Sequence, residues 1–177
     1  MSAATGVLLW QRRFENQFSN NAITPIVYRD TIIMSGYEKG VTAFKPTKRG
    51  DTWETETRWE TQDVSMFMSS PVLVGDTLYG LSQRASGQFF AIDARTGKVL
   101  WLGPAREATN TAVVKAGDLL FLLNDDAELI VAKSNPAGLE AFRRYTVADS
   151  ATWAQPAISG SRVFVKDVSA LALWTLN

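Results

Sequence analysis

The chain has 177 residues, of which 46% are hydrophobic, and its 18 Lys and Arg balance 18 Asp and Glu. Zero formal net charge gives no electrostatic preference for nucleic acid or an anionic membrane. Cys and His are absent, which excludes disulfides, thiolate and Ser-His-Asp catalysis and the commonest zinc ligand. No apolar run is long enough for a transmembrane helix, and residues 1–15 lack a signal peptide's apolar core.

The chain begins with one isolated strand and then a first group of strands. The isolated strand is expected at residues 7–14, within the run GVLLWQRRF. A first group follows, with strands near residues 24–28, 31–35, 40–45 and 53–60, and an insertion after Gly50 separates its last two strands. The runs are rich in β-branched and aromatic residues and show no sustained 3.6-residue periodicity, which favours strands over helices.

Three further groups repeat this pattern. The clearest runs from Ser70 to Trp101, where Gly75-Asp76 predicts a tight turn between the first two strands. Its strands are expected near 70–74, 77–82, 88–93 and 98–101, those of the third group near 111–115, 119–123, 128–133 and 139–145, and those of the fourth near 155–159, 162–166 and 168–174. The fourth group therefore has three strands.

The spacing of the groups indicates a β-propeller. The groups start at Pro25, Pro71, Ala112 and Pro156, which are 46, 41 and 44 residues apart. A period of about 44 residues with four strands per unit is typical of a propeller blade.

Aromatic residues recur at one position of the repeat. The pattern Gly-x-x-x-Trp occurs twice, and the third group has Phe in place of Trp. A flat side chain on an outer strand can cover the face of the next blade, and Gly permits its close approach. Ordinary core packing is the alternative, but the recurrence favours docking. The expected docking residues are Trp10, Trp59 (or Trp53), Trp101 and Phe142, with Gly6, Gly97 and Gly138.

Three motifs resemble the PQQ-like β-propeller family, also called the quinoprotein dehydrogenase-like superfamily. They are AIDARTGKVLW (91–101), ATGVLLW (4–10) and KSNPAGLEAF (133–142). The resemblance implies an all-β fold of tryptophan-docked, four-stranded antiparallel blades. It indicates fold rather than function, because the family includes dehydrogenases, assembly scaffolds and sensors.

The strands expected at the two ends of the chain allow two ways of completing the propeller. Blades are expected at about 22–60, 69–101, 110–145 and 154–177, and residues 7–14 complete the last one if the ring closes on itself. Closure would remove exposed sheet edges. The alternative, which we favour, is half of an eight-bladed propeller, completed by further N-terminal blades or by a second copy in a homodimer.

One face of the propeller is the expected binding face. Turns between second and third strands and connectors between blades share this face, and their sequences vary most. Solvated turn charges and seam-sealing aromatics are the simpler explanation for each residue, and a ring of charge with aromatic anchors is the functional one. The candidates are Glu38, Lys39, Phe67, Arg84, Arg106, Asp125, Asp126, Trp153, Lys166 and Asp167.

No catalytic or metal-binding residues are expected. Asn124, Asp125, Asp126 and Glu128 do not have the spacing of a calcium loop. The favoured function is therefore a non-catalytic, protein-binding or scaffold propeller, for which the resemblance implies a bacterial periplasmic or secreted location. No nucleic-acid partner and no cofactor are expected.

Two alternatives remain. One is part of a PQQ-dependent alcohol or sugar dehydrogenase, for which the resemblance implies PQQ with calcium at the central channel and a catalytic Asp. Such enzymes commonly carry a vicinal Cys pair, and this chain has no Cys. The other is a propeller that binds a small ligand as a sensor.

Overall fold

The protein is built from four antiparallel sheets, each a meander of consecutive strands. The computed structural model describes residues 1–17 and 20–176, so Asn177 of the expected last blade lies outside the described residues. The first sheet contains β1 (Ile26–Tyr28), β2 (Thr31–Ser35), β3 (Val41–Arg49) and β4 (Thr52–Thr61). The second contains β5 (Val72–Val74), β6 (Thr77–Ser82), β7 (Gln88–Asp93) and β8 (Val99–Leu102). The third contains β9 (Thr111–Ala116), β10 (Leu119–Asn124), β11 (Glu128–Lys133) and β12 (Glu140–Thr146). The fourth contains β13 (Ala157–Ser159), β14 (Arg162–Lys166) and β15 (Leu171–Thr175).

The turn between the two innermost strands is the same in every sheet. Gly75, Gly117 and Gly160 have φ values of 61°, 59° and 58°, and Arg29 has 54° at the corresponding position of the first sheet. Gly adopts this left-handed conformation without the steric cost that a side chain brings. The recurring Gly-Asp and Gly-Ser pairs of the sequence therefore reflect a shared backbone requirement.

The core consists of three layers of side chains, one between each pair of neighbouring sheets. Ile33 and Ala43 of the first sheet are buried in one cluster with Leu78 and Ile92 of the second. The second and third sheets, and the third and fourth, share equivalent clusters. Strands between two such layers are apolar on both faces, which is why β6 is buried along its whole length.

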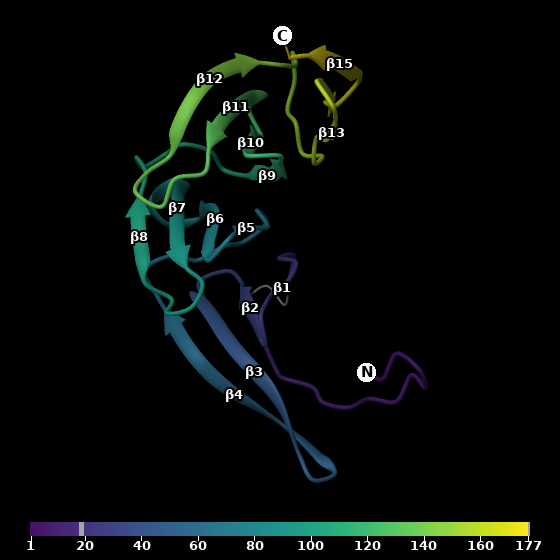
Figure 1. The fold of residues 1–177 in the computed structure, drawn as a ribbon. Helices are drawn as coiled ribbons and strands as arrows, with labels where there is room; N and C mark the ends of the chain where they lie inside the picture. Colours follow the sequence, from purple (N-terminus) through teal and green to yellow (C-terminus); the bar gives the residue numbers. More distant parts are fainter. Residues whose placement is uncertain (18–19, 177) are drawn as a thin grey trace.

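The sheets stack in an open arc, with β1, β5, β9 and β13 on its concave side (Figure 1). This arrangement confirms the expected all-β fold of repeated antiparallel blades. No helix among the described residues is long and apolar enough to cross a membrane.

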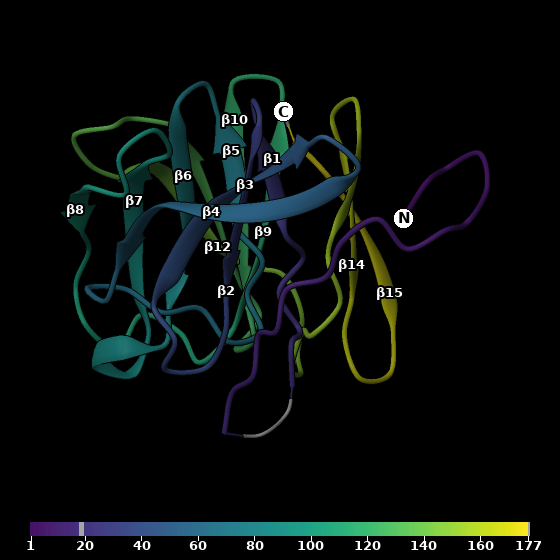
Figure 2. The ribbon, with the colours of Figure 1, turned by 90° about the horizontal axis from the view of Figure 1, so that it is seen from below.

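The structure corrects three of the expected strands. Residues 7–14 are not a strand and pair with no strand in the described part of the chain; the chain before them extends away from the sheets (Figure 2). The insertion after Gly50 lengthens β3 and β4 into a hairpin that projects beyond the arc (Figure 1).

Candidate functional site

The turns and connectors of one face hold each other by hydrogen bonds. Ser35, Ser82 and Asn124 each end the second strand of their sheet, and all three are buried. The Ser35 hydroxyl accepts a hydrogen bond from the amide of Met66 at 2.9 Å, and the Ser82 hydroxyl accepts one from the amide of Ser65 at 3.1 Å. These bonds hold the connector after the first sheet against the second strands of two sheets.

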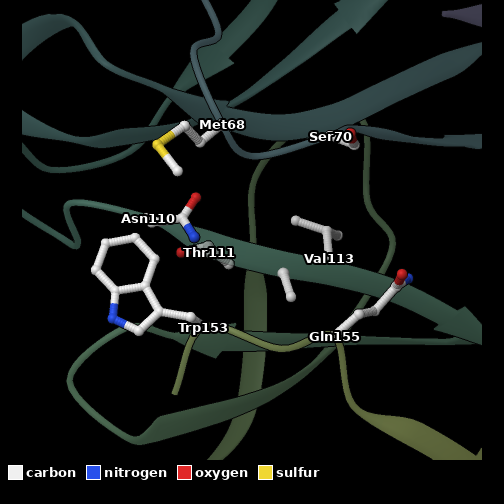
Figure 3. A pocket seen from close by; sticks show the side chains of 8 residues that line it. Met68, Ser70, Asn110, Thr111, Val113, Trp153 and Gln155 are labelled. Carbon is white, nitrogen blue, oxygen red and sulfur yellow. The ribbon is translucent and has the colours of Figure 1, made fainter. Parts of the chain in front are cut away.

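A cavity of about 150 Å³ opens on the same side of the molecule, where the second, third and fourth sheets begin. Met68 and Trp153 stand on opposite sides of it, with Asn110 between them (Figure 3). Met68 is 46% exposed and Trp153 is 55% exposed. The cavity is lined by Met68, Ser70, Asn110, Thr111, Ala112, Val113, Trp153 and Gln155. Its lining contains no charged side chain, so it suits a neutral ligand.

A buried polar network supports the cavity from below. The Ser69 hydroxyl donates to Oδ1 of Asn110 at 2.6 Å and accepts from the amide of Thr111 at 2.8 Å. The Thr111 hydroxyl donates to Oδ1 of Asn124 at 2.5 Å. Since Oδ1 of Asn110 faces Ser69 and its Nδ2 donates to no group among the described residues, that amide is available to a ligand.

Among the predicted binding residues, Trp153 lines the cavity and Asp125 supports it. The Asp125 carboxylate accepts hydrogen bonds from the amides of Asn110 at 3.0 Å and Thr109 at 3.2 Å. The amide of Asp125 in turn donates to the carbonyl of Asn110. Asp125 therefore positions the connector that carries Asn110 instead of facing a ligand.

The other predicted carboxylates and Lys166 shape their own turns. Asp126 accepts from the amide of Glu128 at 3.2 Å. Asp167 accepts from the amides of Ala170 and Ser169, and these bonds hold the pKa of its carboxyl below the usual value. The Lys166 ammonium bonds the carbonyl of Asp167.

The remaining predicted residues lie on the same face outside the cavity lining. Glu38 has a φ of 56° in a tight turn, and Arg106 has a φ of 62° at a bend of the connector after β8. The exposed Arg84 begins the 3₁₀ turn η1 (Arg84–Ser86). Phe67 packs edge-on against Tyr37, with ring centroids 5.1 Å apart. The carbonyl of Lys39 accepts a hydrogen bond from the side chain of Gln62 at 3.4 Å.

The predicted docking aromatics connect neighbouring sheets in different ways. Trp59 of β4 donates to the carbonyl of Ala94 in the second sheet at 3.0 Å and lies over Gly97. Trp101 of β8 donates to the carbonyl of Asn135, beyond β11, at 3.2 Å. Ala94 and Asn135 each precede a motif Gly, Gly97 and Gly138, by three residues, so the two contacts are equivalent in the repeat.

The other members of that predicted set make fewer contacts. Trp10 meets the ring of Phe44 edge-on at 5.8 Å, whereas Phe142 is exposed. Gly138 and Gly6 have no neighbouring atom that a Cβ would meet. A substitution at either position would therefore meet no steric obstacle from packing.

Met68, Asn110 and Gln155 of the cavity were not among the sequence candidates. A signal for Met68 existed, because it precedes Pro71 by three residues as Trp153 precedes Pro156. The repeat alignment thus places these two residues at equivalent positions, two sheets apart. The sequence could not show that they flank one cavity, because that depends on the curvature of the arc.

The residues present do not fit PQQ with calcium. The described part of the chain contains no group of three or more Asp, Glu, His or Cys that could hold a metal ion. The cavity of about 150 Å³ is also smaller than the roughly 300–1,000 Å³ typical of small-molecule sites. No catalytic step is therefore derived through a quinone.

Comparison with protein families and curated proteins gives one match. A family model described as "Outer membrane protein assembly factor BamB" matches residues 1–102. Comparison with the sequences of curated proteins gives no match.

Solved structures with similar folds are β-propellers and designed proteins. BamB from Moraxella catarrhalis has a TM-score of 0.59 and 12% identity, over 88% of this chain and 45% of that one. The computationally designed Ika4 protein has a TM-score of 0.61 and 9% identity, over 86% of this chain and 89% of that one. The β-propeller domain of Cps50 (Swd1) from Myceliophteria thermophila has a TM-score of 0.60 and 14% identity, over 84% and 53%. The chain thus spans about half the length of BamB and Cps50, and the likeness at these identities concerns the fold.

Proposed function

Because this chain belongs to the PQQ-like β-propeller family of the outer membrane protein assembly factor BamB, we propose that it is a non-catalytic module that binds other proteins. The observation that carries the proposal is the pair of exposed side chains, Met68 and Trp153, on either side of the cavity. Trp and Met are enriched in protein interfaces, where large apolar side chains act as anchors. Met also adapts its shape to different partners.

The size of the cavity favours a side chain of a partner over a free small molecule. A volume of about 150 Å³ is too small to enclose a cofactor or a drug-sized ligand. It is open to solvent between Met68 and Trp153, so a single apolar side chain can enter from an extended segment.

The polar groups at the cavity favour a peptide backbone beside that side chain. Asn110 presents a free amide donor, and Gln155 adds an amide that can donate and accept. A peptide offers both acceptors and donors along its backbone. We therefore propose a neutral, extended peptide segment with one apolar anchor residue as the ligand.

Membership of the family supports a proposal for the cellular location and the role of this chain. An assembly-factor propeller acts in the bacterial envelope, and we propose that location and a scaffold role for this chain. We also propose that its arc is half of an eight-bladed propeller, because it corresponds to 45% of the BamB chain with the similar fold. A dehydrogenase role has no support from the cavity or from the carboxylates.

Binding to peptide arrays made from envelope-protein sequences would test the proposal. Trp153→Ala and Met68→Ala should each weaken peptide binding by roughly tenfold or more, as expected for anchor residues. Trp53→Ala, on the projecting hairpin formed by β3 and β4, is the matched control and should leave binding unchanged. If peptides bind equally to Trp153→Ala, Met68→Ala and the unsubstituted chain, the cavity is not the binding site.

A further inference from the structure

The fourth sheet has an unpaired edge where every other sheet has a strand. β15 pairs with β14 along one edge, and no strand in the described part of the chain pairs with the other. In the other sheets the third strand pairs with a fourth, namely β4, β8 or β12. An unpaired edge presents backbone donors and acceptors to any strand that can align with it.

Two grooves follow this edge. They have volumes of about 320 and 280 Å³, and Trp174 of β15 lines both. Tyr145 and Val147 of the third sheet and its connector form the opposite wall of the first groove. A fourth strand added beside β15 would lie next to these grooves.

The outer face of the fourth sheet packs against no other sheet in the described part of the chain. Leu171 and Leu173 on this face are 69% and 53% exposed, and Leu173 pairs with Phe164 of β14. The corresponding pair in the first sheet, Ile33 and Ala43, is buried against the second sheet. The open face thus continues the series of sheet-to-sheet interfaces that already holds the arc together.

The N-terminal segment has the sequence of a fourth strand. Residues 6–10, GVLLW, correspond to residues 97–101, GKVLW, and the latter contribute to β8. Val7 and Leu8 are each 58% exposed and pair with no strand among the described residues. This segment therefore has the apolar side chains of a fourth strand and lacks the rest of its sheet.

The segment is already docked on the first sheet as a fourth strand docks on the following sheet. The Trp10 ring meets Phe44 edge-on, and the Arg12 guanidinium lies 4.8 Å from the centre of the same ring. Arg12 also donates to the Thr57 hydroxyl at 3.1 Å. Trp59 and Trp101 reach the following sheets in the same direction along the chain. The described part of the chain contains no sheet before the first one to which this segment could belong.

We propose that residues 7–14 of one copy add as an antiparallel fourth strand to β15 of a second copy. The two arcs, joined in this way at both ends, form a closed ring of eight sheets with two-fold symmetry. The segment and β15 lie at opposite ends of the arc of one chain, so a second copy can join them without bending the arc (Figure 1). This interface is independent of ligand binding at the cavity formed by Met68 and Trp153.

The register of the added strand follows from the complete sheets. Trp59 pairs with Ala43, and Trp101 pairs with Ala91. Leu173 holds the position of Ala43 in the last sheet, because the third residue of the second strand pairs with it in both sheets. Trp10 of one copy is therefore expected opposite Leu173 of the other, and Gln11 opposite Ala172.

Mass in solution tests the association. The chain should have twice its 19.5 kDa mass by light scattering after gel filtration. Leu173→Asp should weaken the dimer by at least about tenfold, because it places a charge in an apolar interface. Val168→Asp, at a more exposed position in the turn before β15, should leave the dimer intact. A monomer across the micromolar range, or a dimer unaffected by Leu173→Asp, would overturn the proposal.

Disulfide trapping tests the register of the added strand. Because the sequence contains no Cys, only the introduced cysteines can form a disulfide. Chains with Gln11→Cys mixed with chains carrying Ala172→Cys should form a covalent dimer on mild oxidation. The control mixture of Gln11→Cys with Val168→Cys should not. Equal trapping in both mixtures would contradict the register, and a mass above that of the dimer would contradict the closed ring.

Discussion

The indole of Trp59 donates a hydrogen bond to the carbonyl of Ala94 and lies against Gly97, in the space that a side chain at Gly97 would need. The outer strand of one sheet thus reaches the turn of the next and joins the two at their rims. Trp101 repeats the hydrogen bond one sheet further along. The contact explains why a glycine is required at this turn for two separate reasons, one of backbone conformation and one of space.

Gly97→Ala should separate these two reasons. A Cβ on Gly97 would lie 2.4 Å from a carbon of the Trp59 ring, and the residue has a φ of 76°. The control Gly117→Ala has a similar φ of 59° with open space around it. Chemical denaturation should show a loss of stability for Gly97→Ala that exceeds that of the control by about 1–3 kcal/mol. Equal losses would mean that the indole moves aside without cost.

The buried network under the cavity should contribute measurably to stability. Ser69→Ala removes both the donor to Asn110 and the acceptor for the Thr111 amide, and leaves two buried groups without partners. We expect a loss of roughly 2–4 kcal/mol in the free energy of unfolding. Ser169→Ala, at an exposed turn, should change it by less than about 0.5 kcal/mol. A similarly small loss for Ser69→Ala would show that water replaces the hydroxyl.

Stability at acid pH should depend on Tyr28. The Tyr28 hydroxyl donates to the Asp76 carboxylate at 2.5 Å, and this bond is the main cause that lowers the pKa of Asp76 below 3.8. Because the pKa in the folded state is lower than in the unfolded chain, the stabilisation is present above about pH 4 and disappears as the pH falls through the folded-state value.

Tyr28→Phe removes that hydrogen bond and should raise the pKa of Asp76 toward 3.8. The midpoint of acid unfolding, followed by circular dichroism at low salt, should then move to higher pH. Tyr145→Phe, at an exposed position whose hydroxyl bonds no carboxylate among the described residues, provides the comparison. An unchanged midpoint in Tyr28→Phe would show that Arg29 and Arg95 maintain the low pKa without the hydroxyl.

The sequence alone determined the repeat and hence the architecture. Strand alternation, the Gly-Asp turn pairs and the period of the starts at Pro25, Pro71, Ala112 and Pro156 all depend on local chemistry that each repeat contains by itself. The turn glycines, for example, are favoured by a positive φ that every copy of the hairpin has. Local signals of this kind do not need the rest of the chain.

Only the tertiary structure decided how distant residues meet. Met68 and Trp153 flank one cavity because the arc bends their connectors together over the third sheet, and the sequence contains no measure of that curvature. Asp125 looks in sequence like a ligand-binding charge, but its hydrogen bonds hold a neighbouring connector. Residues 7–14 have the composition of a strand and no sheet to join, because strand formation requires a partner edge that local sequence cannot supply.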